Sequence, residues 1–114
     1  MANESLFAFA GLWDRWRDPK SNDVWETCAI LTTPPNSLVA DVHDRMPAIL
    51  KIEDYDVWLD PGMTDAIVVA DHLKPFDASL MKKYPVSAHV NRPENDDPEC
   101  AQEVSISVAQ PALF

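Results

Sequence analysis

The sequence predicts an α+β fold, with mixed, mainly antiparallel strands and short helices in a single domain. Three observations lead to this prediction. The chain has 114 residues, 46% hydrophobic and 25% charged, which is a globular balance and too short for two ordinary domains. Aromatic and β-branched runs alternate with polar turns, as in short strands. Ten prolines argue against long uninterrupted helices.

The first half of the chain predicts an antiparallel hairpin. Residues 5–16 (SLFAFAGLWDRW) and 24–33 (VWETCAILTT) are rich in aromatic and β-branched side chains, so both are expected to be strands. Between them, residues 17–23 (RDPKSND) supply the Pro, Ser, Asn and Asp of a turn. Side chains expected in the core or at its edge are Trp13, Trp16, Trp25, Trp58 and Cys28.

The middle of the chain predicts short helices around one short strand. Asn36 or Ser37 is expected to cap a short helix whose apolar face carries Leu38, Val39 and Val42. A strand is predicted over 47–50. Helices are predicted over 51–62, with acids in the first turn and DPG as a stop, and over 63–76, with Thr64 as cap and Pro75 as terminator.

The last third predicts a strand over 84–91, a polar loop over 92–100 and one more short strand within 101–114. The domain is expected to span residues 5–108, followed by a frayed tail over 109–114.

Composition limits the possible partners and compartment. The net charge of −10 disfavours a general nucleic-acid coat, although a small local basic groove is compatible with it. Two cysteines do not make a disulfide scaffold, and no apolar run approaches the ~18–20 residues of a membrane span. The N-terminus lacks the features of a secretory signal. We therefore expect a soluble cytoplasmic protein with no membrane partner and no cofactor.

His43 is the leading candidate for chemistry, because imidazole titrates nearest neutrality and this ring is surrounded by Asp41, Asp44 and Arg45. An acid can orient one ring nitrogen while the other transfers a proton. From these residues alone, a structural histidine is favoured over a catalytic one. A metal site at Asp41, His43 and Asp44 is weakly supported, because no second His or Cys stands at ligand spacing, and we expect no metal.

Other candidates favour structural roles. A serine triad of Ser37 or Ser87 with His43 lacks a G-x-S-x-G motif. His72 lies near a helix end and His89 on an expected strand. Cys100 stands in an acidic loop without a cation to activate its thiol.

Four stretches together resemble a known family: FAFAGLWDRW, CAILTTPPNSLVADVHDRMPAIL, YDVWLDP and YPVSAHVNRPENDDPEC. Their order and spacing are similar to those of the SOS-response-associated peptidase (SRAP) family of abasic-site processing proteins. The HDRMP block is the most specific signature, and the YPVSxxVN segment is its usual companion. The resemblance covers nearly all of this chain but only about the C-terminal half of the family domain.

The resemblance implies binding to single-stranded DNA that carries an abasic site, in the cytoplasm and at the nucleoid on damage. Family members use an N-terminal cysteine, whose α-amine and thiol close a thiazolidine on the sugar aldehyde, which crosslinks protein to DNA. By resemblance, His43 is the catalytic histidine and Arg45 meets a phosphate. Thr32 lines the site, and Ser87 and Asn91 contact DNA.

The departures from the family are equally informative. Residue 2 is Ala2, and neither Cys28 nor Cys100 carries a free α-amine. The family's asparagine and glutamate belong to a first half that is not in these residues. Peptidase or lyase-like activity of the chain alone is therefore uncertain, and we expect a truncated member that is inactive by itself. Such a half would expose apolar faces and need the missing N-terminal half or a second copy.

Two alternatives stay open. The chain could be a non-enzymatic remnant or interaction module that pairs through an exposed edge with a separate N-terminal half. It could also be an unrelated hydrolase built around His43, which would need a serine or cysteine within hydrogen-bond reach of the ring.

Overall fold

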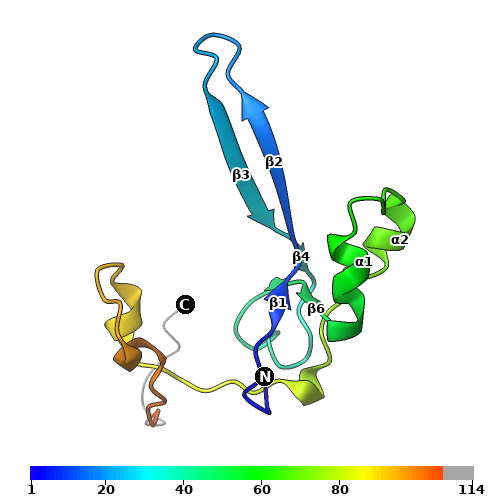
Figure 1. The fold of residues 1–114 in the computed structure, drawn as a ribbon. Coiled ribbons are helices and arrows are strands. Elements are labelled where there is room, and N and C mark those ends of the chain that lie inside the picture. Colours follow the sequence, from blue (N-terminus) through cyan, green and yellow to red (C-terminus); the bar gives the residue numbers. More distant parts are fainter. Residues whose placement is uncertain (107–114) are drawn as a thin grey trace. The chain divides into compact units, whose positions relative to one another are not determined.

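The computed structural model describes residues 1–106. These residues belong to two compact units, the first over Met1–Lys82 and the second beginning at Lys83. Strands, α-helices and 3₁₀-helices all occur, and every strand pairing is antiparallel, which confirms the predicted α+β class (Figure 1). Within the described residues, no helix has the length and apolar character needed to cross a membrane.

The first unit contains three separate antiparallel strand pairs. β2 (Gly11–Arg17) and β3 (Val24–Ile30) form the long hairpin that the sequence predicted. β1 (Ala8–Phe9) pairs with β6 (Ile49–Leu50). β4 (Thr32–Thr33) pairs with β5 (Met46–Pro47). The strand expected over 47–50 is therefore present, interrupted by one residue.

The three pairs meet at a ring of backbone hydrogen bonds between Ala10, Leu31 and Ala48. Ala10 N–H donates to Ala48 O at 2.7 Å, Ala48 N–H donates to Leu31 O at 2.9 Å, and Leu31 N–H donates to Ala10 O at 2.9 Å. Each residue stands between two strands, where the chain changes pairing partner. The ring satisfies an amide and a carbonyl of each residue at a point where no continuous ladder could do so.

A small core surrounds this ring. Ala10 and Ala48 are 0% and 1% exposed, and Leu50 is buried with them. Half-buried side chains from the rest of the unit pack against these three, namely Leu31, Tyr55, Trp58 and Leu73. Small side chains suit positions where three backbone segments approach this closely.

The helices are shorter than predicted. The helix expected over 51–62 consists of a 3₁₀ turn, η1 (Ile52–Asp54), and α1 (Tyr55–Leu59). Trp58 is half-buried, as expected, and its Nε1–H donates to Gly11 O at 3.2 Å, which ties α1 to the base of the hairpin. A further 3₁₀ turn, η2, covers Ala78–Leu80.

The helix predicted over 63–76 is only α2 (Ala66–Ala70). Its cap is Asp65 rather than Thr64, because the Asp65 carboxylate accepts from the amides of Ile67 and Val68. The helix ends well before Pro75, so proline does not set its end.

The prediction of a short helix after Asn36 is wrong. Residues 37–42 form hydrogen-bonded turns, with isolated helix-like bonds from Ala40 N–H to Asn36 O and from His43 N–H to Val39 O. The capping chemistry itself is present, since Asn36 Oδ1 accepts from the amides of Leu38 and Val39 at 3.1 and 3.0 Å.

The prediction that side chains of the hairpin lie in the core or at its edge is also wrong. Every residue of β2 and β3 is exposed, and Trp13 and Trp25 keep 71% and 59% of their surface open. Trp16 is exposed as well, and so is Cys28, which was expected to be a small core residue. The aromatic and β-branched residues predicted the strands correctly, but within the described residues no second layer covers either face of the hairpin.

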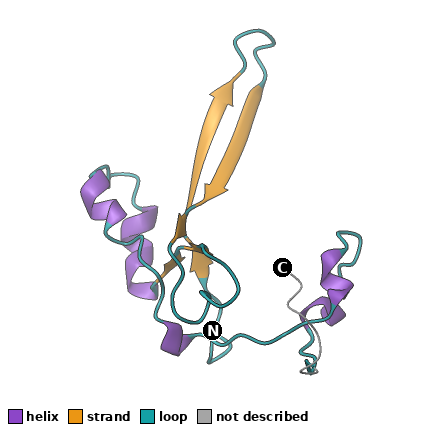
Figure 2. Cartoon of the chain, turned by 180° about the vertical axis from the view of Figure 1, so that it is seen from behind, coloured by secondary structure: helices purple, strands orange, loops and turns teal. Residues whose placement is uncertain are grey.

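The second unit is built from turns and 3₁₀-helices (Figure 2). The prediction of a strand over 84–91 is wrong, because the 3₁₀-helix η3 occupies Ala88–Asn91. The loop predicted over 92–100 ends in η4 (Pro98–Ala101). Of the segment 101–114, where the last strand was expected, the structure describes residues 101–106, in which Glu103 forms a single bridge with Val86. Residues 107–114, including the tail predicted over 109–114, lie outside the described residues.

Exposed apolar side chains on the hairpin predict self-association. The pairing of Trp16 with Trp25 places both rings on one face beside Leu12. We expect the double variant W16T/W25T to shift the chain from oligomers toward monomer in sedimentation velocity, because Thr keeps β propensity but removes aromatic area.

The matched control is R15T/E26T, which removes the cross-strand ion pair of the same hairpin and leaves the tryptophans in place. A wild-type chain that sediments as a monodisperse monomer would contradict this prediction.

Candidate functional site

The segment from His43 to Arg45 leads directly into β5, and the register of β5 positions it. Thr33 lies opposite Met46 and Thr32 lies opposite Pro47. Because side chains two residues apart share a face of a strand, Arg45 and Pro47 point to the same side. Arg45 is therefore the diagonal neighbour of Thr32 across the β4–β5 pair.

Arg45 and Thr32 are in direct contact, as this register implies. Arg45 Nη2 donates to the backbone oxygen and to Oγ1 of Thr32, both at 2.9 Å, and Nε donates to the same Oγ1 at 3.3 Å. All of these acceptors are neutral. The guanidinium is thus held in place without a carboxylate partner among its described contacts, and its positive charge stays available to an anion.

His43 is an open, solvent-exposed ring whose side chain keeps 68% of its surface. Its Nδ1 accepts from Arg45 N–H at 3.0 Å and lies 3.1 Å from Asp44 Oδ1. These two contacts require different protonation states. The neutral ring accepts from the amide and carries its proton on Nε2, whereas the protonated ring donates from Nδ1 to Asp44. Either way, Nε2 is the atom that remains for other chemistry.

Asn36 fixes the loop that carries His43. Besides capping the first turn, its Nδ2 donates to Phe76 O at 2.7 Å and lies 3.3 Å from Met81 Sδ. Its backbone N–H contacts Met46 Sδ at 3.2 Å. Asn36 therefore connects the loop, β5 and the segment around η2. The sequence indicated only its capping role, because the contacts across forty residues have no local signal.

Ser87 and Asn91, the other predicted DNA-contacting residues, belong to the second unit. Ser87 is the cap of η3, where its Oγ accepts from His89 N–H at 3.3 Å. Asn91 is the last residue of η3 and is exposed. The structure brings Thr32, His43 and Arg45 together in the first unit and Ser87 and Asn91 near each other in the second.

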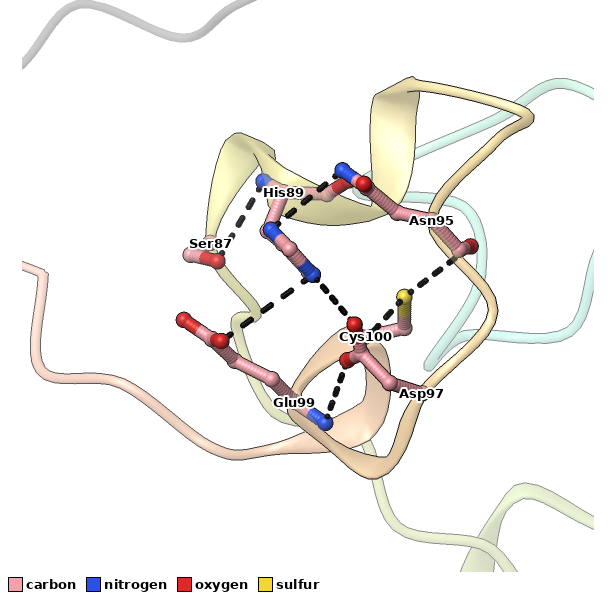
Figure 3. A network of polar contacts seen from close by, with 6 residues as sticks. All are labelled: Ser87, His89, Asn95, Asp97, Glu99 and Cys100. Carbon is pink, nitrogen blue, oxygen red and sulfur yellow. Dashed lines mark hydrogen bonds and ion pairs between the residues drawn. The ribbon is translucent and has the colours of Figure 1, made fainter.

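A polar cluster that the sequence analysis missed surrounds His89 (Figure 3). His89 Nε2 lies 2.9 Å from Asp97 Oδ2, and Nδ1 lies 3.3 Å from Asn95 Nδ2. The Cys100 thiol donates to Asn95 O at 3.4 Å. The hydrogen bond that His89 Nε2–H donates to the Asp97 carboxylate raises the pKa of His89 and lowers the pKa of the Asp97 carboxyl. The sequence predicted a strand at His89, and a strand gave no reason to expect this cluster. The 3₁₀ turn η3 directs the His89 ring toward η4.

The remaining candidates have structural contacts or none that suit catalysis. His72 Nδ1 lies 3.4 Å from Asp54 Oδ1, and both side chains are largely buried, so this pair joins the end of α2 to η1. The contacts described for His43 include no serine or cysteine, which leaves the hydrolase alternative without a nucleophile. Among residues 1–106, Asp41, His43 and Asp44 do not form a cluster with metal-ligand spacing.

Comparison with known proteins supports the resemblance drawn from the sequence. The profile of the family described as "SOS response associated peptidase (SRAP)" matches residues 1–93. The abasic site processing protein YoqW of Bacillus subtilis (strain 168) is 46% identical over 99 residues, which cover 87% of this chain and 44% of YoqW. The abasic site processing protein HMCES of Gallus gallus is 33% identical over 104 residues, which cover 90% of this chain and 30% of HMCES.

A solved structure agrees with these matches. A crystal structure of a protein from Bacteroides thetaiotaomicron superposes with a TM-score of 0.75 at 36% identity, covering 87% of this chain and 44% of that one. The matches define an α+β chain related to abasic site processing proteins. The chain belongs to the SRAP family. It spans less than half the length of these relatives.

The His89–Asp97 pair predicts a pH window for the second unit. Because the pKa of His89 is raised, its stabilisation is complete below the ordinary value of 6.5 and is lost as pH rises through the folded-state pKa. Because the pKa of Asp97 is lowered, the stabilisation that Asp97 contributes to the fold is complete above its ordinary pKa of 3.8. That stabilisation is lost as pH falls through the folded-state pKa. In NMR titrations with a chelator present, we expect His89 to titrate above 6.5.

The control is Asp97→Asn, which should return the titration midpoint of His89 toward its ordinary range. A wild-type His89 that titrates at or below 6.5 would contradict this account.

Proposed function

We propose that this chain supplies the histidine and arginine side of an SRAP site that processes abasic lesions in single-stranded DNA. The observation that carries the proposal is the fixed arrangement of Thr32, His43 and Arg45 at the end of the β4–β5 pair. An exposed imidazole next to an unpaired guanidinium suits a reacting sugar that is attached to phosphates. The names of the relatives support the same lesion class.

Arg45 is proposed to bind a backbone phosphate beside the lesion. Thr32 holds Nε and Nη2, so the guanidinium is oriented before DNA arrives and loses little side-chain freedom on binding. The net charge of −10 makes such a local cation more important, because the rest of the chain repels DNA. Thr32 would line the site, and Ser87 and Asn91 would contact the strand further along.

His43 is proposed to transfer protons between the amine, the sugar and the thiol. In its protonated state, Nδ1 donates to Asp44 and Nε2 can give a proton to the hydroxyl that leaves the carbinolamine as water. The neutral ring that results has a lone pair on Nε2, which can accept a proton from the attacking thiol. Asp44 thus orients the ring in the state that begins the step.

The nucleophile must come from elsewhere than these 114 residues. Thiazolidine closure needs an α-amine and a thiol on the same residue, and position 2 is Ala2. Cys28 lies within β3 and Cys100 within η4, so neither has a free α-amine. We therefore propose that crosslinking requires a second polypeptide segment that carries an N-terminal cysteine.

The exposed hairpin supports a second candidate function, an interaction module without catalysis. β2 and β3 carry large apolar side chains that are exposed on both faces of the hairpin. A partner segment of apolar character would bury them, whether or not the assembled protein reacts with DNA.

Complementation distinguishes the two functions. The chain is co-expressed with the part of B. subtilis YoqW that it does not match, and the complex is incubated with single-stranded DNA containing one abasic site. We expect an adduct that survives denaturing electrophoresis from the complex and none from the chain alone. His43→Ala should slow adduct formation by about 100-fold or more, as loss of a general acid–base group does.

The phosphate contact is tested in the same complex by Arg45→Gln. For one lost phosphate contact on single-stranded DNA, the slope of log affinity against log salt should fall by about 0.7. Arg15→Gln is the matched control, because its charge is already paired with Glu26. An adduct from the chain alone, or equal effects of the two arginine variants, would contradict the proposal. A stable complex that binds but never crosslinks would favour the interaction module.

A further inference from the structure

We propose that His89, Asp97 and Cys100 form a metal site for Zn²⁺ or a similar divalent ion in the second unit. The site lies outside the abasic-site chemistry and does not depend on it. Its three donor atoms, an imidazole nitrogen, a carboxylate oxygen and a sulfur, all lie within 4.8 Å of one another (Figure 3). Among the described residues, this is the group with metal-ligand spacing.

The distances suit tetrahedral coordination after small side-chain shifts. His89 Nε2 is 2.9 Å from Asp97 Oδ2, and Cys100 Sγ is 4.0 Å from Asp97 Oδ1. In a tetrahedral zinc site with bonds of about 2.0–2.3 Å, neighbouring donors are roughly 3.3–3.8 Å apart. The distance between His89 and Asp97 must therefore increase and the distance between Cys100 and Asp97 must decrease, each by less than about 1 Å.

A fourth ligand is within reach. Glu99 Oε2 lies 4.0 Å from His89 Nε2, the ring nitrogen that Asp97 also contacts. The donor set of one nitrogen, one sulfur and two carboxylates suits zinc better than calcium or magnesium, which prefer oxygen ligands alone. A thiolate and two carboxylates around one neutral imidazole also concentrate negative charge that a divalent cation would neutralise.

The second unit has a physical need for such a site. None of the described residues from 83 to 106 is buried, so no apolar core holds η3 against η4. Segments this small usually depend on a metal, a disulfide or a partner to hold one structure. The three ligands come from η3, from the cap of η4 and from η4 itself, so one ion would join both turns.

Metal binding would replace protons in the present hydrogen bonds. His89 now shares a proton with Asp97 through Nε2, and Cys100 carries a thiol proton that points to Asn95 O. When the metal binds to the protonated ring and the thiol, the Nε2 proton and the thiol proton both leave. The ring is then neutral and keeps its proton on Nδ1. The longer contact of Asn95 Nδ2 with Nδ1 would then open, while Nδ2 keeps its hydrogen bond to His89 O at 2.7 Å.

The test is a Co²⁺ titration of the full chain under reducing conditions, followed by Zn²⁺. We expect one equivalent of Co²⁺ to bind, with intense visible bands of tetrahedral cobalt and a near-ultraviolet thiolate-to-cobalt band, and Zn²⁺ to displace it. Cys100→Ser should abolish the thiolate band and weaken binding at least about tenfold. Cys28→Ser is the matched control, because this thiol lies exposed on the hairpin, and it should change neither.

A second measurement needs no variant. In amide spectra of the wild-type chain, added Zn²⁺ should shift the resonances of residues 87–100 and leave those of β2 and β3 in place. The absence of a thiolate band in the wild-type chain, its loss in Cys28→Ser with retention in Cys100→Ser, or Zn²⁺ shifts confined to the hairpin would each overturn the proposal.

Discussion

The hydrogen-bond ring of Ala10, Leu31 and Ala48 is the constraint on which the first unit depends. Three stretches of chain cross at this point, and each changes its pairing partner there. Because the three carbonyls and three amides bond one another in a closed cycle, the crossing leaves none of them without a partner. The two alanines allow the backbones to approach, and the side chains of the small core then gather around them.

The ring also determines the geometry of the candidate site. Leu31 immediately precedes β4 and Ala48 immediately follows β5, so the bond between them sets the register of that pair. That register places Arg45 diagonally across from Thr32, and the Arg45 amide in turn contacts His43. The position of the loop that carries His43 and Arg45 therefore depends on a backbone interaction that involves neither of these two side chains.

The local parts of this structure could be predicted from the sequence, and the long-range parts could not. The hairpin and its turn follow from residue type and spacing, and the HDRMP block singled out His43 and Arg45, which the structure places in contact with each other. The error at Trp13, Trp16 and Trp25 has a physical reason: aromatic and β-branched residues indicate a strand, but they do not show whether another layer covers its faces. The cluster around His89 was missed because a serine cap and a 3₁₀ turn, rather than strand pairing, determine the backbone there.

The two units are stabilised in different ways. The first unit has a small core and carries the family's signature, whereas the second has polar contacts among the caps of its 3₁₀ turns in place of a core. The chain spans less than half the length of the relatives it matches, and its hairpin exposes several large apolar side chains, including three tryptophans.

Amide hydrogen exchange tests the central claim most directly, because it reports the free energy needed to open each backbone hydrogen bond. If the ring organises the first unit, the amides of Ala10, Leu31 and Ala48 will be the slowest to exchange between Met1 and Lys82, far slower than those of the exposed hairpin. Exchange of the three ring amides as fast as those of Asp14 and Thr27, in the middle of β2 and β3, would contradict the account.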